Sequence, residues 1–246
     1  MNEKVARIFS KVVLADEPVH IKLLGDSITH GVGGTGWQQN GEPITAGFAR
    51  SPESFCWANC FRDHMETRYN CTVTNNACTG TRIEFILEHF DELVSPEDDI
   101  VLCAIGTNNR NQDYADAPMH TPGEHMRLFY PKILALHDRF LAAGKDVVFI
   151  ANIPASAFKE SGNDSFARLF HTWDVHDMYM KAAAERGFAF ISLYNGMLEY
   201  CERRGIVPDA LLADGLHPHD RGHAVIFRLI MAETGLAMNL PAFNGD

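Results

Sequence analysis

Short segments rich in apolar and β-branched residues recur along the chain and predict the strands of a sheet. They lie at residues 21–24, 72–76, 100–105, 147–151 and 188–193. Brief apolar runs between turn signals are typical of buried strands, and the unbroken run at 100–105 indicates a strand covered on both faces.

Helical spacing of apolar positions marks most segments between these strands. The expected helices cover residues 54–68, 82–90, 123–143, 165–186, 197–203 and 221–234. Near the N-terminus, Val5, Ile8, Phe9, Val12 and Val13 fit one helical face. We therefore expect residues 1–18 to form a docking segment that packs on the rest of the chain.

This alternation of strands and helices predicts an α/β fold, because right-handed crossovers place helices on both faces of a parallel sheet. We expect a three-layer α/β/α sandwich with a five-stranded parallel sheet in the flavodoxin-like order 2-1-3-4-5. The sequence contains no linker, repeat or low-complexity segment, so residues 1–246 are predicted to form a single domain.

Composition and charge narrow the classes of partner. The formal net charge is −11 and no cluster of Lys and Arg interrupts it, which argues against nucleic acid or an anionic membrane as a partner. Charged residues interrupt residues 1–20, and no apolar run has the length of a membrane span. We therefore expect a cytoplasmic protein. Its six cysteines, which include no C-x-x-C pair, are expected to be reduced and structural.

Candidate chemistry begins where the first strand stops at Gly25-Asp26-Ser27. In this fold the carboxyl end of a strand is where ligands bind, so Ser27 is expected to be accessible there. The alternative is that Asp26 and Ser27 only cap the next helix. Far along the chain, Asp214 and His217 stand three residues apart and offer a base with an orienting carboxylate. A serine hydroxyl needs both groups to act as a nucleophile.

Four blocks, at residues 25–28, 76–80, 106–108 and 214–217, together resemble the SGNH (GDSL-type) hydrolase family. The resemblance implies that Ser27 is the nucleophile, His217 the general base and Asp214 its partner. It also implies an oxyanion hole formed by the backbone N–H groups of Ser27 and Gly80 and the side chain of Asn108. Singly, each residue also fits a turn or a cap; jointly they favour a hydrolase.

Two positions depart from the family pattern. Asn109 stands where the family usually has aspartate, and Ala77 stands where glycine is common. We expect the first change to alter a structural hydrogen bond or a substrate contact, and the second to tilt the loop that carries Gly80. Neither change removes a catalytic group.

The segment Gly31-Val32-Gly33-Gly34-Thr35-Gly36 satisfies the dinucleotide pattern G-x-G-x-x-G. Five residues separate it from the strand end, no helix is expected to open after it, and the second strand ends in Asn75-Asn76 instead of an acidic residue. The signal for a nucleotide is therefore weak.

Histidine and aspartate groups raise the alternative of a metallohydrolase. One group is Asp214, His217, His219 and His223, and the other is His171, Asp174, His176 and Asp177. Pro218 and the expected helices make it difficult for either group to converge around an open coordination position. We expect neither a metal nor another cofactor.

The sequence thus predicts a serine esterase that hydrolyses short-acyl esters, acetyl above all, of carbohydrates through an acyl-enzyme on Ser27. Polar loops at residues 31–52 and 110–122 are expected to wall the site, with Trp37, Asn109 and Arg110 as candidate substrate contacts. The alternatives are a lysophospholipase or thioesterase-type acyl hydrolase, or a non-catalytic sugar-binding domain on the same fold. The sequence leaves the natural substrate and the oligomeric state open.

Overall fold

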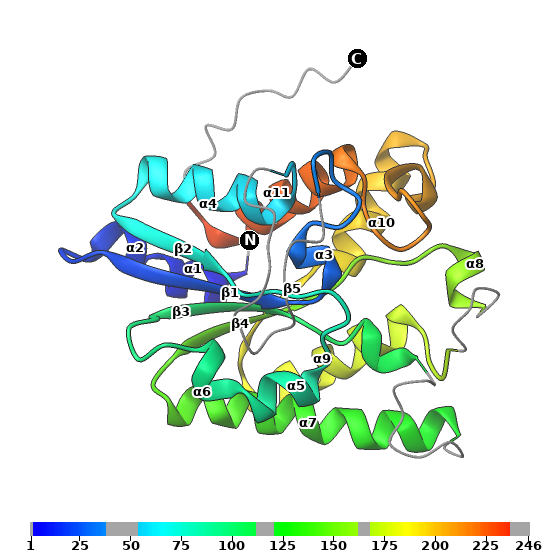
Figure 1. Cartoon of the computed structure of the whole chain (residues 1–246), viewed down its shortest axis with the longest axis horizontal. Helices are drawn as coiled ribbons and strands as arrows, with labels where there is room; N and C mark the ends of the chain where they lie inside the picture. Colours follow the sequence, from blue (N-terminus) through cyan, green and yellow to red (C-terminus); the bar gives the residue numbers. More distant parts are fainter. Residues whose placement is uncertain (1, 38–53, 112–120, 162–167, 237–246) are drawn as a thin grey trace.

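Five parallel strands form the centre of the computed structural model, which describes residues 2–37, 54–111, 121–161 and 168–236 (Figure 1). The strands are β1 (Val19–Gly25), β2 (Cys71–Asn75), β3 (Ile100–Ala104), β4 (Asp146–Ala151) and β5 (Ala189–Ser192). Their order is β2-β1-β3-β4-β5. The predicted α/β fold and strand order are therefore confirmed.

The register of the strands brings three loops to one edge of the sheet. Leu23 of β1 pairs with Asn75 of β2, and Gly25 pairs with Ala104 of β3. All three strands run in the same direction, so the segments that follow them leave side by side. The first, second and third blocks of the sequence pattern therefore begin at the same edge.

Helices cover both faces of the sheet. On one face pack α1 (Glu3–Phe9), α4 (Trp57–Arg68), α10 (Leu193–Arg204) and α11 (Asp220–Thr234). On the other pack α5 (Ile83–Glu88), α6 (Phe90–Leu93), α7 (Pro122–Ala142) and α9 (Thr172–Arg186). Successive strand residues point to opposite faces, so Leu23 belongs to the first hydrophobic core and Leu24 to the second.

The N-terminal segment packs on the first of these cores. Asn2 caps α1 through its side chain, which accepts hydrogen bonds from the Lys4 and Val5 N–H groups. Phe9 is fully buried, whereas Val13 is 60% exposed. The expectation of one continuous apolar face was wrong for Val13, because α1 ends at Phe9 and a separate short helix, α2 (Lys11–Leu14), follows.

Three further helices differ from the prediction, and one of them, α10, begins at Leu193 instead of residue 197. Only residues 83–88 of the helix expected at 82–90 form α5, and a new turn, α6, begins at Phe90. The helix expected from residue 165 begins at Thr172; before it, Arg168 forms an isolated bridge with Asn111, and the Leu169 N–H donates to the Arg110 carbonyl. Hydrogen bonds to the segment at residues 110–111 thus keep residues 168–169 from joining the helix. The structure also contains two short helices that we did not predict, α3 (Ser27–His30) and α8 (Ala157–Glu160).

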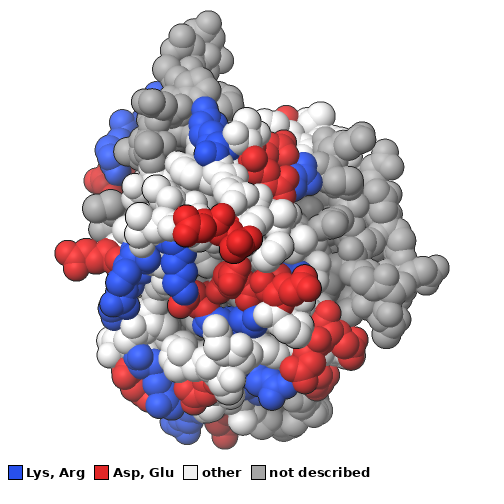
Figure 2. All heavy atoms as spheres, turned by 90° about the vertical axis from the view of Figure 1, so that its left-hand side faces the viewer, with Lys and Arg blue, Asp and Glu red and all other residues white. Residues whose placement is uncertain are grey.

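The face at the amino-terminal ends of the strands carries charges of both signs. Figure 2 shows a group of Lys and Arg side chains toward the left of this face and a band of acidic side chains across its centre. The described part of this face therefore lacks the extended basic surface typical of nucleic-acid binding. Within the described ranges, no helix combines the length and apolarity needed to cross a membrane.

We predict that Phe9→Ala lowers the free energy of unfolding by about 3–5 kcal/mol, because it leaves a cavity in the first core. Phe9 is fully buried and meets Phe61 edge to face, with 6.2 Å between the ring centroids. Urea denaturation measures the change. Val13→Ala is the matched control and should cost less than about 0.5 kcal/mol. Equal losses for the two variants would contradict the docked position of α1.

Candidate active site

A hydrogen-bonded chain joins Ser27, His217 and Asp214. The Ser27 Oγ lies 2.9 Å from His217 Nε2, and His217 Nδ1 lies 2.8 Å from Asp214 Oδ2. An ionised carboxylate only accepts hydrogen bonds, so the proton of a neutral His217 ring belongs on Nδ1. His217 Nε2 is then free to accept the hydroxyl proton of Ser27.

Local hydrogen bonds hold the Asp214 carboxylate in its ionised form. Its Oδ1 accepts the backbone N–H groups of Leu216 and His217, at 2.9 and 2.8 Å. Partial burial raises the pKa of Asp214, but the hydrogen bonds and the charge of His217 outweigh this and hold the pKa well below its ordinary value. Asp214 is therefore an anion at neutral pH and stabilises a positive charge on His217.

The backbone around Ser27 explains why the serine lies at the end of β1. Asp26 is the N-cap of α3, and its Oδ1 accepts the Ile28 N–H at 3.0 Å. A Cβ at Gly25 would approach Thr29 Oγ1 to 2.4 Å and the Ala104 carbonyl oxygen to 2.8 Å, so only glycine fits this turn. Asp26 alone supplies the side-chain cap, which leaves the Ser27 hydroxyl for His217.

A buried polar cluster lies directly behind this turn. Asp26 is fully buried, and its Oδ2 accepts a hydrogen bond from Asn152 Nδ2 at 3.1 Å. Asn152 also donates to the Thr107 hydroxyl at 2.8 Å, and the Thr107 hydroxyl lowers the pKa of Asp26. Burial outweighs these hydrogen bonds and raises the pKa of Asp26 to about 6. Our sequence interpretation missed Asn152, although its place directly after β4 was a usable signal.

The three expected oxyanion-hole groups come from the ends of β1, β2 and β3. Gly80 has φ +79°, a conformation that favours glycine, and the Cys78 N–H ties its loop to the Gly25 carbonyl at 3.2 Å. Asn108 Nδ2 donates to the Thr81 carbonyl at 3.0 Å, which leaves its second N–H for another acceptor. Among the described residues, the backbone N–H groups of Ser27 and Gly80 have no hydrogen-bond acceptor.

Asn109 and Arg110, two of the candidate substrate contacts, are both buried and bonded to other side chains, and a role for them in substrate binding stays a prediction. Asn109 is buried; its Oδ1 accepts the Ile83 N–H at 3.1 Å and its Nδ2 donates to Glu84 at 2.7 Å. Arg110 is fully buried and pairs with Glu160. Asn109 thus anchors the start of α5, and the departure from the family's aspartate keeps an acceptor there. Ala77, the other departure, is fully buried.

Trp37, the third candidate substrate contact, is half-buried beside the loop that carries Gly80. Its Nε1 donates to His30 Nδ1 at 3.2 Å, and the Thr79 hydroxyl lies 3.3 Å from the same nitrogen. A role for Trp37 in substrate binding stays a prediction. Most of the two polar loops expected to wall the site, residues 38–53 and 112–120, lies outside the described residues.

The glycine-rich segment after α3 packs against the loop that carries His217. A Cβ at Gly33 would approach the Pro218 carbonyl oxygen to 2.4 Å, and one at Gly34 would approach the Phe55 carbonyl oxygen to 2.0 Å. Thr35 donates hydrogen bonds to Asp220 through both its N–H and its hydroxyl, each at 2.7 Å. Close backbone packing against the loop that carries His217 accounts for Gly33, and packing against Phe55 accounts for Gly34.

The remaining histidines of the candidate metal groups have other partners. His219 Nε2 contacts the Ala210 carbonyl at 2.9 Å, and His223 Nε2 contacts the Val32 carbonyl at 3.2 Å. In the part of the chain that the structure describes, no three His, Cys, Asp or Glu side chains are grouped to hold a metal ion. All six cysteines are free thiols, and burial raises the pKa of Cys78, whose N–H donates to the Gly25 carbonyl.

Solved structures share this fold. The acetylxylan esterase Axe2 from Geobacillus stearothermophilus is 16% identical, with a TM-score of 0.64 over 90% of this chain and 96% of that chain. LAE5, an α/β hydrolase enzyme from the metagenome of Lake Arreo in Spain, is 18% identical, with a TM-score of 0.67 over 89% of this chain and 96% of that one. A lipase/acylhydrolase from Enterococcus faecalis is 20% identical, with a TM-score of 0.64 over 87% and 94%.

Identities this low show a likeness of fold, and membership of a family needs a match in sequence. No curated protein matches the chain significantly. The family model of the GDSL-like lipase/acylhydrolases matches residues 23–225, which include the strand end at Ser27 and the loop at His217. The chain therefore belongs to the GDSL-like lipase/acylhydrolase family and is a serine hydrolase of ester bonds.

Proposed function

We propose that this protein hydrolyses short-acyl esters, acetyl esters above all, through an acyl-enzyme on Ser27. The observation that carries the proposal is the chain of hydrogen bonds from Ser27 Oγ through His217 to Asp214, at 2.9 and 2.8 Å. Serine, imidazole and carboxylate in this order are the parts of an activated nucleophile.

In the first step Ser27 Oγ attacks the ester carbonyl carbon while its proton moves to His217 Nε2. The Asp214 carboxylate stabilises the imidazolium that forms. The carbonyl oxygen gains negative charge, and the N–H groups of Ser27 and Gly80, with the side chain of Asn108, donate to it. His217 then protonates the leaving alcohol, and a water molecule activated by the same imidazole releases the acid from Ser27.

Two observations support a short acyl group on a hydroxylated alcohol. Axe2, which shares the fold over most of both chains, is described as an acetylxylan esterase. Trp37 lies beside the Gly80 loop and offers an aromatic surface of the kind that packs on sugar rings. With Asn109 and Arg110 assigned to the interior, the preference for carbohydrate esters rests on these observations and on the polar composition of the loops.

We predict that Ser27→Ala lowers kcat/KM for p-nitrophenyl acetate by at least about a thousandfold, because no nucleophile remains. The variant should keep its thermal unfolding midpoint and lose labelling by a fluorophosphonate probe. Ser10→Ala, which removes a hydroxyl at the far end of the molecule, is the control and should behave as wild type. Full activity in Ser27→Ala would exclude the acyl-enzyme, and a folded wild type that resists labelling would favour the non-catalytic binding domain.

Asn108→Ala is expected to lower kcat about a hundredfold to a thousandfold, which is the usual cost of one oxyanion donor. KM should change little, since the donor acts on charge that develops in the transition state. Asn76→Ala is a matched control, because Asn76 also follows a strand and donates to a backbone carbonyl, that of Leu93. Steady-state kinetics on the same ester compare the two; similar losses would contradict the assignment of Asn108.

Acyl-chain preference tests the short-acyl part of the proposal. We expect kcat/KM to fall from p-nitrophenyl acetate to butyrate to octanoate, and a panel of acetylated oligosaccharides to release acetate. Faster hydrolysis of octanoate would instead favour a lysophospholipase or thioesterase-type enzyme. The Ser27→Ala variant serves as the blank for spontaneous hydrolysis in both assays.

A further inference from the structure

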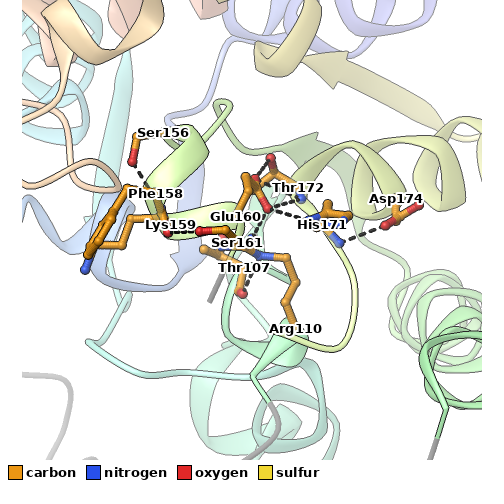
Figure 3. A network of polar contacts seen from close by, with 10 residues as sticks. All are labelled: Thr107, Arg110, Ser156, Phe158, Lys159, Glu160, Ser161, His171, Thr172 and Asp174. Carbon is orange, nitrogen blue, oxygen red and sulfur yellow. Dashed lines mark hydrogen bonds and ion pairs between the residues drawn. The ribbon is translucent and has the colours of Figure 1, made fainter. Parts of the chain in front are cut away.

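Figure 3 shows a network of polar contacts around Glu160, and from it we infer that Glu160 is a positioning residue for catalysis. Through Arg110 it holds the loop that carries Asn108, and through α8 it holds the loop that carries Asp214 and His217. This inference rests on the proposed function and extends it to a residue outside the four sequence blocks.

The Glu160 carboxylate lies at the centre of the network. It is 7% exposed, and its Oε2 accepts a hydrogen bond from a terminal nitrogen of Arg110 at 2.8 Å. It also accepts the Thr172 N–H at 3.2 Å and the Thr172 hydroxyl, and it contacts His171 Nδ1 at 3.2 Å. Because several donors converge on this buried carboxylate, its position is fixed. Loss of its charge would leave the Arg110 guanidinium buried without a counter-charge.

Arg110 carries this constraint to the oxyanion loop. Its Nε donates to the Thr107 carbonyl at 3.0 Å, one residue before Asn108 (Figure 3). The hydroxyl of Thr107 accepts a hydrogen bond from Asn152, which also donates to Asp26, and Asp26 directly precedes Ser27. The Arg110 guanidinium thus holds the Thr107 backbone from one side while the cluster behind Ser27 holds its side chain from the other.

The short helix α8 carries the constraint to the histidine loop. Glu160 ends α8, and its N–H donates to the carbonyl of Ser156, the N-cap residue, at 2.9 Å. The Ser156 N–H in turn donates to the Gly215 carbonyl at 2.7 Å. Gly215 has φ +84°, and a Cβ there would approach Ser156 Oγ to 2.4 Å. Gly215 stands between Asp214 and His217 in the sequence, so α8 contacts the loop that carries both residues.

The Glu160 carboxylate therefore couples two loops: one carries the oxyanion donor Asn108, and the other carries the general base His217. The Asn108 side chain must meet the oxyanion, and the His217 imidazole must meet the Ser27 hydroxyl, in the same arrangement. Small displacements of such groups reduce the rate of the chemical step far more than they reduce substrate binding. A positioning role thus predicts a loss in kcat with little change in KM.

The test is Glu160→Gln, which keeps the shape of the side chain and removes its charge. We expect kcat for p-nitrophenyl acetate, and the rate of fluorophosphonate labelling, to fall about tenfold to a hundredfold, with KM within about twofold. The matched control is Asp98→Asn. Asp98 is a buried carboxylate that pairs with Lys22 at 3.5 Å, before β3 at the other edge of the sheet. The Asp98→Asn substitution should lower the unfolding midpoint while leaving kcat unchanged.

A kcat in Glu160→Gln that matches wild type, with only the unfolding midpoint lowered as in Asp98→Asn, would reduce Glu160 to a structural residue and overturn the inference. If Glu160→Gln does not fold, Glu160→Asp carries the test, because it keeps the charge and displaces it; the same loss in kcat at unchanged KM is expected. Wild-type turnover in the same assay separates the proposed esterase function from the positioning role of Glu160. An inactive, unlabelled wild type overturns both. An active wild type, together with Glu160 variants that have wild-type kcat, overturns the positioning role alone.

Discussion

The hydrogen bond between Ser27 and His217 joins side chains 190 residues apart in the sequence, and the site depends on it. Nothing local brings these two groups together. Ser27 is placed by the end of β1, while His217 is placed by a loop that packs on residues 31–36 and on α8. The parallel sheet makes the meeting possible, because its strands release their loops at a common edge.

Close backbone approach is a second constraint on the site. A Cβ added at Gly25, Gly33 or Gly215 would lie 2.4 Å from a neighbouring oxygen. Gly25 lets the chain turn from β1 into α3, Gly33 lets the histidine loop approach, and Gly215 lets Ser156 donate to that loop. Side chains at these positions would separate the segments that carry Ser27 and His217. These three glycines thus serve the geometry of the candidate site as much as the turns in which they occur.

One group of buried charges lies behind the site, and a separate pair, Lys22 and Asp98, lies at the other edge of the sheet. Asp26, Arg110 and Glu160 are each less than a tenth exposed, and each makes several hydrogen bonds to backbone or side-chain groups of other loops. Burying such groups costs free energy unless their hydrogen bonds are satisfied. Their hydrogen bonds offset this cost, and their position between the loops fits the positioning role inferred for Glu160.

The sequence by itself determined the α/β class, the strand order, all five strands and the order of the four motif blocks. The class, the strands and the blocks follow from short-range patterns, because apolar runs, helical spacing and strand-end glycines are local. The strand order was predicted from an order that is common in this fold class. It also identified Ser27, Asp214, His217, Gly80 and Asn108 as candidates, and the catalytic roles of these residues remain predictions. Only the tertiary structure decided that Val13 is exposed, that α9 begins at Thr172 and that Asn109 and Arg110 lie in the interior. A polar residue next to a motif has the same local pattern whether it faces solvent or a buried carboxylate such as Glu160, and long-range packing alone distinguishes the two.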